Sequence, residues 1–217
     1  MNHSLPSEDL KLRLLREVES TPSSPRPLES KRTAWLVAIA LLASFSVFLV
    51  FGGVRLTGRP PSLVLGTVIG TATIAALAIW AMIGRGRAMM GRASSWLTAV
   101  AIASPLGLLV WKVLWSAQFE NGLDAWERRP GFRCLGLGLA MGALPLAAML
   151  FGRRGTDAVH PGRAGMAIGI GVGLGAATLV DAWCPVAYVP HLLLGHLLPL
   201  ALLGAVGFWL GRKILAP

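Results

Sequence analysis

Apolar residues in this chain gather into long stretches separated by short polar segments. A stretch of about 20 apolar residues is long enough for a helix to cross the ~30 Å hydrocarbon core of a bilayer. Backbone N–H and C=O groups in lipid must be bonded within the segment, which favours α-helices for these stretches. The pattern therefore predicts an all-α, polytopic membrane helix bundle. Its six expected spans are about 35–53, 61–83, 95–115, 134–152, 164–184 and 191–211.

The ends of these spans predict three helical hairpins. The second, fourth and sixth spans each finish with the dipeptide Gly-Arg, at positions 84–85, 152–153 and 211–212. The recurrence of this dipeptide is consistent with an internal repeat, and it is also consistent with a common way of ending a helix at a charged interface. In either case the three ends are expected on one side of the membrane.

The distribution of basic residues predicts the orientation of the hairpins. Of the 20 lysines and arginines, one, Lys112, lies within a span, and most of the others lie in segments on the side of the amino terminus. Cytoplasmic segments carry such an excess, so both termini are expected in the cytoplasm. The net charge of +10 then reflects topology, and we expect no direct nucleic-acid partner. The outer loops hold only Arg55, Arg59, Arg128, Arg129 and Arg133.

Composition agrees with a membrane location. Hydrophobic residues make up 54% of the 217 residues and charged residues 14%, whereas roughly a quarter of a soluble domain is charged. The first 33 residues are too polar and too long for the start of a signal peptide, and no cleavage site follows the first apolar run. We therefore expect residues 1–33 to form a cytoplasmic segment and residues 34–217 to form the six-helix transmembrane domain.

The cytoplasmic segment divides into an amphipathic leader and a Pro/Ser linker. Leu10, Leu14, Leu15 and Val18 fall on one stripe of a short helix over residues 7–19. A helix of about 12 residues is marginal alone in water, so it needs a surface on which to fold. That surface is either a protein partner or anionic lipid. The linker that follows, residues 20–27, has no core-forming residues and would act as a tether.

The only two cysteines, Cys134 and Cys184, are expected at matching ends of two neighbouring spans. In an antiparallel hairpin their thiols would lie at the same depth near the outer face. A disulfide requires Cα atoms about 4.4–6.8 Å apart, which this arrangement permits. Either each cysteine is a small apolar filler, or the two form a redox- or metal-responsive pair.

Two charged residues lie inside spans. Asp181 is three residues before Cys184, hence on roughly the same helix face, and Lys112 is at similar depth at the outer end of its span. An acid within a span is costly and is usually paired or functional. We expect an intramembrane ion pair between Lys112 and Asp181; the alternative is that Lys112 extends outward alone to the interface.

Two histidines open the last span, shortly after Cys184. With the two cysteines, His191 and His196 could complete a tetrahedral site for a soft metal ion. On a helix, however, a step of five residues turns His196 well away from His191. The sequence therefore leaves two alternatives open. A metal ion could bind transiently at Cys134 and Cys184 alone, or the two histidines could complete its site.

The function classes can be narrowed by what the sequence lacks. It contains no P-loop, no G-x-S-x-G and no H-E-x-x-H motif, so we do not expect an enzyme. A small transporter or a structural subunit of a membrane complex remains an alternative, since Pro105, Pro145 and Pro199 could break helices near mid-membrane. No charged residue near the expected midplane would bind a substrate.

Several short segments in chain order resemble one bacterial family. They are Trp111-Lys112, the stretch 133–135 with Cys134, the Arg-Arg-Gly of the loop at 153–155, the stretch Val180 to Pro185, and the segment from His191 to His196. The leader pattern around Leu10 is also similar. The resemblance is to the DUF1109 family, the NrsF-type membrane anti-sigma factors that negatively regulate an extracytoplasmic-function (ECF) sigma factor.

The resemblance implies a function and a site. The resemblance implies a multi-pass protein of the bacterial inner membrane that holds an ECF sigma factor inactive at the cytoplasmic face. It also implies that Cys134 and Cys184 respond to stress such as heavy metals. Some members carry a histidine just before the second cysteine, where this chain has Trp183. The H-x-x-x-C-x-x-C motif of soluble zinc-binding anti-sigma factors is absent.

Overall fold

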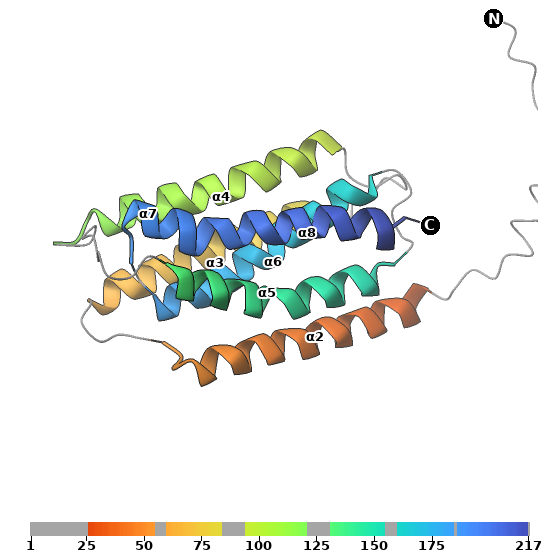
Figure 1. Ribbon diagram of the computed structural model, residues 1–217, viewed down its shortest axis with the longest axis horizontal. Helices are drawn as coiled ribbons and strands as arrows, with labels where there is room; N and C mark the ends of the chain where they lie inside the picture. The colour runs from red at the N-terminus through yellow and green to blue at the C-terminus, as the bar shows by residue number, and fades with distance from the viewer. Residues whose placement is uncertain are drawn as a thin grey trace, which may run out of the picture.

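The computed structural model describes residues 26–54, 60–83, 94–120, 131–154, 160–184 and 186–216. Within these ranges the chain forms helices and no strand (Figure 1). The last span is continuous but changes geometry, since a short π-helix, η1, joins α7 to α8. The elements are α2 (Arg26–Val50), α3 (Pro61–Ile83), α4 (Ser94–Ser116), α5 (Phe132–Gly152), α6 (Pro161–Trp183), α7 (Val189–Leu192), η1 (Leu193–Leu197) and α8 (Leu198–Ile214).

The helices have the length and composition of membrane spans. Five are long and apolar enough to cross a bilayer, the last being α7, η1 and α8 taken together as Val189–Ile214, and Ala34–Val50 is a shorter apolar helix. The prediction of an all-α membrane bundle is confirmed. Helix α2 begins at Arg26, so it includes the last two residues of the predicted linker and residues 28–33 of the predicted cytoplasmic segment. The predicted leader stripe lies outside the described residues.

Successive long helices run in alternating directions (Figure 1). The carboxyl end of α8 and the start of α2 therefore lie at one end of the bundle, on the right of the view. The ends of α2, α4 and α6 lie at the other end with the starts of α3, α5 and α7. This opposite end carries every site residue that the sequence suggested within the described ranges.

Helix α6 is the centre of the bundle. It packs against α8, α3, α5 and α4, and two thirds of its span is buried by protein, the largest share of any span. Small residues make this central position possible, because Gly165 and Gly169 face the backbone of α8. Close helix approach through small residues is the usual packing device in membranes, where apolar side chains gain little by leaving lipid.

A pair of tryptophans joins α4 to α3. The indole rings of Trp111 and Trp115 stack with centroids 5.5 Å apart, and they lie directly over Gly70 and Gly66 of α3. The Trp115 Nε1–H also donates to the Leu63 carbonyl oxygen at 3.2 Å. The two glycines therefore make room for aromatic rings, and Lys112 is held beside this rigid seam.

Candidate metal and redox site

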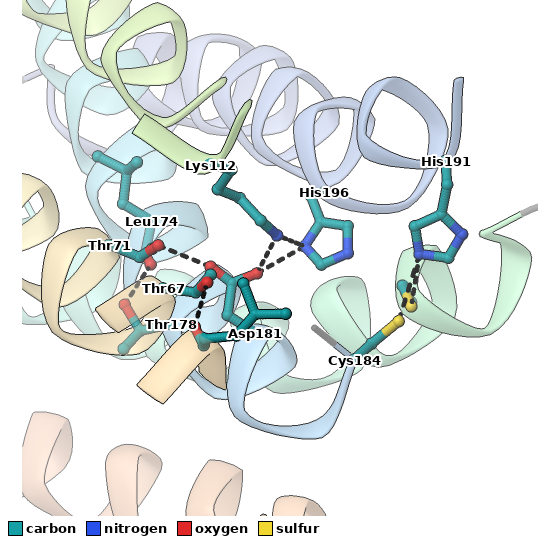
Figure 2. A network of polar contacts seen from close by, with 11 residues as sticks. Thr67, Thr71, Lys112, Leu174, Thr178, Asp181, Cys184, His191 and His196 are labelled. Atoms are coloured by element: carbon teal, nitrogen blue, oxygen red, sulfur yellow. Dashed lines mark hydrogen bonds and ion pairs between the residues drawn. The ribbon is translucent and has the colours of Figure 1, made fainter. Parts of the chain in front are cut away.

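Asp181 is the centre of a buried polar network near the end of α6. Its side chain is fully buried and contacts polar groups on three other elements (Figure 2). The Thr71 hydroxyl donates to Oδ2 at 2.6 Å, Lys112 Nζ donates to Oδ1 at 2.5 Å, and His196 Nδ1 lies 2.9 Å from Oδ1. Helices α3, α4 and α6 and the π-helix are thus joined at one carboxylate.

Lys112 points into the bundle toward Asp181 and does not extend outward along α4. Its side chain is buried, like that of its partner, and Nζ also lies 3.1 Å from His196 Nδ1. Lys112 and Asp181 together carry no net charge, which is how a charge is tolerated away from water. The structure therefore brings together the two intramembrane charges that the sequence singled out.

The two cysteines lie one layer further toward the end of the bundle. Both are buried and are not joined in a disulfide, and both contact the same imidazole nitrogen. Nε2 of His191 is 3.3 Å from the Sγ of Cys184 and 3.5 Å from the Sγ of Cys134. The thiols, which are 50 positions apart in the sequence, are held there by the start of α5 and the residue after α6.

The expectation that His196 turns away from His191 is wrong. Their ring centroids are 5.4 Å apart, because residues Leu193–Leu197 form a π-helix. The Leu198 N–H donates to the Leu193 carbonyl oxygen five residues earlier. A π-helical turn brings positions five apart onto neighbouring faces, and such turns are frequent at functional sites. The five-residue spacing that argued against a joint site is the spacing that this turn requires.

Two glycines let the π-helix approach α5. A Cβ atom on Gly195 would lie 3.0 Å from the Cβ of Cys134, so a larger residue would push the histidines away from that cysteine. Gly131, just before α5, has a φ of 85°, a left-handed conformation that glycine adopts without strain. It also faces the backbone of Gly195. These close contacts set the distance between Cys134 and the two imidazoles.

Sequence reasoning missed Thr71 and Gly195. A threonine in a membrane helix often bonds its own backbone, as Thr67 does to the Leu63 carbonyl, so nothing marked Thr71 as different. Trp183, which directly precedes Cys184, is no part of the cluster. Its Nε1–H donates to the Phe51 carbonyl oxygen at the end of α2, at 2.9 Å.

The groups at this end define what the site can do chemically. Ligand atoms of Cys134, Cys184, His191 and His196 all lie within 4.8 Å of one another. Thiolates and imidazoles are the ligands that zinc and softer metal ions prefer, and two neighbouring thiols can also be oxidised. The described part of the chain therefore gathers two thiols and two imidazoles, groups whose chemistry suits metal binding or thiol oxidation, one layer from a buried ion pair.

The fold and this centre define a class: a helical membrane protein with thiols and imidazoles gathered at one end of the bundle. A family model described as "Negative regulator of sigma F" matches residues 18–216. The chain belongs to this family, NrsF, and is a negative regulator of a sigma factor, as the resemblance predicted. No curated protein and no solved structure matches the chain.

Proposed function

We propose that this protein is an anti-sigma factor of the bacterial inner membrane that holds an ECF sigma factor at the cytoplasmic face. Metal or oxidant reaching Cys134 and Cys184 releases the sigma factor. The observation that carries the proposal is the convergence of the only two cysteines on His191. They do so at the end of the bundle opposite the start of α2, to which the leader is joined (Figure 1).

The leader supplies the sigma-binding surface in this proposal. Leu10, Leu14, Leu15 and Val18 form the apolar stripe, and each buried leucine or valine stabilises a complex by about 1.5–3 kcal/mol before ordering costs. The stripe folds on the sigma factor because it is too short to be a stable helix alone. The continuous helix α2 then links this bound segment to the bundle.

Release requires two arrangements of the bundle that differ in affinity for the sigma factor. Helix α6 is the element best suited to couple them, since it precedes Cys184 directly, carries Asp181 and packs against four other long helices. A change in the position of Cys184 would move Asp181 on the same helix. It would thereby alter the contacts of its carboxylate with Thr71, Lys112 and His196. The signal would travel along α6 to the cytoplasmic end.

Charged substitutions in the leader test the binding site. The double variant Leu14→Asp/Val18→Asp should lose sigma-factor capture in a pull-down from detergent-solubilised membranes, because two carboxylates would be buried without partners at the interface. Arg16→Asp, on the opposite face of the predicted helix, is the matched control and should retain most of the binding. Capture by the double variant at the wild-type level would contradict the proposed leader site.

Serine substitutions test the sensing role of the cysteines. Cys134→Ser or Cys184→Ser should each abolish induction of the sigma-dependent genes by cadmium or oxidant, since either change removes one thiolate of the pair. A reporter fused to a sigma-dependent promoter measures the response, and immunoblotting of membranes shows that each variant accumulates. An unchanged response in both variants would exclude sensing through these thiols.

A further inference from the structure

Four candidate ligand atoms lie close together at one end of the bundle. They belong to Cys134, Cys184, His191 and His196, and all are within 4.8 Å of one another. A tetrahedral zinc site with bonds of about 2.0–2.3 Å has neighbouring ligand atoms roughly 3.3–3.8 Å apart. The contacts of His191 Nε2 with the two sulfurs, at 3.3 and 3.5 Å, already fall in that range. The set needs only a small contraction.

His196 offers a nitrogen that the rest of the described structure leaves without a partner. Its Nε2 atom is buried and makes no hydrogen bond among the described residues, although its side chain is fully enclosed. A buried polar atom without a partner is costly and calls for an explanation. The ring lies between Lys112 and His191 in Figure 2, with Nδ1 turned to Lys112 and Asp181. The unpartnered nitrogen is therefore on the opposite edge.

Asp181 fixes the form of the His196 ring that can bind a cation. Nδ1 lies 2.9 Å from the Asp181 carboxylate, which only accepts, and 3.1 Å from the Lys112 ammonium, which only donates. A proton on Nδ1 makes the shorter of these two contacts a hydrogen bond to the carboxylate. The Nε2 lone pair is then available. Histidines that bind metals commonly donate their other N–H to a carboxylate in this way, which fixes the tautomer and orientation of the ring.

We propose that Cys134, Cys184, His191 and His196 form a four-ligand site for a soft or borderline divalent cation of the zinc and cadmium class, with Asp181 as the residue that positions His196. The π-helix is the structural device that places both imidazoles in the site. The binding site itself is argued from the geometry alone. The identification of its metal ion as the inducing signal rests on the function proposed above.

The charge balance favours binding in this buried position. Two thiol protons leave to water as two metal–sulfur bonds form, while both histidines bind as neutral rings. A dication therefore enters and two protons leave, so the net charge of the bundle end is unchanged. The negative charge of Asp181 is already balanced by Lys112. Magnesium and calcium require oxygen ligands, and this donor set provides none.

Cobalt(II) can report the ligands directly. We expect the reduced, metal-free full chain in detergent micelles to bind one equivalent of Co²⁺ with intense visible bands of tetrahedral geometry and a near-ultraviolet thiolate charge-transfer band. Zn²⁺ or Cd²⁺ should displace the cobalt and remove these bands, and Mg²⁺ should not. No sigma factor is present, so this measurement is independent of the regulatory proposal.

Two substitutions of histidine by asparagine separate the ligands from other histidines. His196→Asn keeps an N–H near the position of Nδ1 for Asp181 but removes Nε2, and it should weaken Co²⁺ binding by more than about tenfold and change the visible bands. His160→Asn, at the start of α6 and the other end of the bundle, should bind as the wild type does. Asp181→Asn should weaken binding by about 10–100-fold, the range for residues that orient a ligand.

Thiol protection in the unaltered protein avoids any effect of substitution on folding. One equivalent of Cd²⁺ should slow alkylation of both Cys134 and Cys184, measured by mass spectrometry of each labelled peptide. Octahedral cobalt bands, no thiolate band, or unprotected cysteines would overturn the site. Unchanged binding in His196→Asn would overturn the four-ligand set and leave a site of fewer ligands. Metal binding without an effect of cadmium on gene induction would instead contradict only the signalling role.

Discussion

Replacing Lys112 with methionine is expected to lower the free energy of unfolding by about 3–5 kcal/mol, the cost of leaving a buried charge without its partner. Methionine has nearly the volume of lysine, so packing beside Trp111 and Trp115 is retained and the charge alone is lost. Asp181 would keep its bonds from Thr71 and His196 but no ammonium. Reversible unfolding in mixed micelles with increasing denaturing detergent measures the change.

Removal of both charges provides the decisive comparison. The double variant Lys112→Met/Asp181→Asn should recover much of the lost stability, because an amide oxygen still accepts from Thr71 and no charge is buried. Lys213→Met is a matched control at the other end of the bundle, where the ammonium lies over the Trp209 ring; its loss should cost no more than about 1 kcal/mol. If the single and double Lys112 variants lost the same free energy of unfolding, the ion pair with Asp181 would not be the source of the stabilisation by Lys112.

Hydropathy predicted the bundle because the physics of a span is local. A run of apolar residues forms a helix in lipid whatever other segments pack against it, because its backbone groups must bond within the run. The predicted second span, 61–83, accordingly agrees with α3 at both ends. The contact between Lys112 and Asp181 could be anticipated for a similar reason, since a charge within a span must find a partner close to its own depth.

The proximity of His191 and His196 could not be predicted, because it depends on a π-helix that the hydrophobic periodicity of the sequence does not indicate. The five-residue step between His191 and His196 favours opposite faces only if every turn is α-helical, and the π-helix breaks that condition. The sequence carries one signal in retrospect. Pro199 follows Leu198 directly and has no N–H to donate, so the regular α-helical ladder is interrupted at that point in any case. The position of Gly195 against Cys134 depends on tertiary packing alone.

Replacing Gly169 with alanine is expected to destabilise the protein by about 3 kcal/mol, toward the upper end of the usual cost of adding a methyl group to a packed interior. The new Cβ would overlap the Leu203 carbonyl oxygen and lie 2.9 Å from the Gly204 Cα. These are backbone atoms and cannot rotate away, so α6 and α8 would have to separate. The same unfolding measurement in mixed micelles reports the loss.

Gly175 of the same helix gives the opposite expectation. A Cβ there meets no atom within 4 Å, so Gly175→Ala should be neutral or should stabilise by up to about 1 kcal/mol through helix propensity. The two variants also differ at the bundle end, because α8 continues directly from the π-helix that carries His196 while α6 leads to Cys184. Gly169→Ala should therefore raise the alkylation rate of Cys184 severalfold, and Gly175→Ala should leave it unchanged. Equal rates in both would mean that the seam between α6 and α8 does not hold the thiols against the imidazoles.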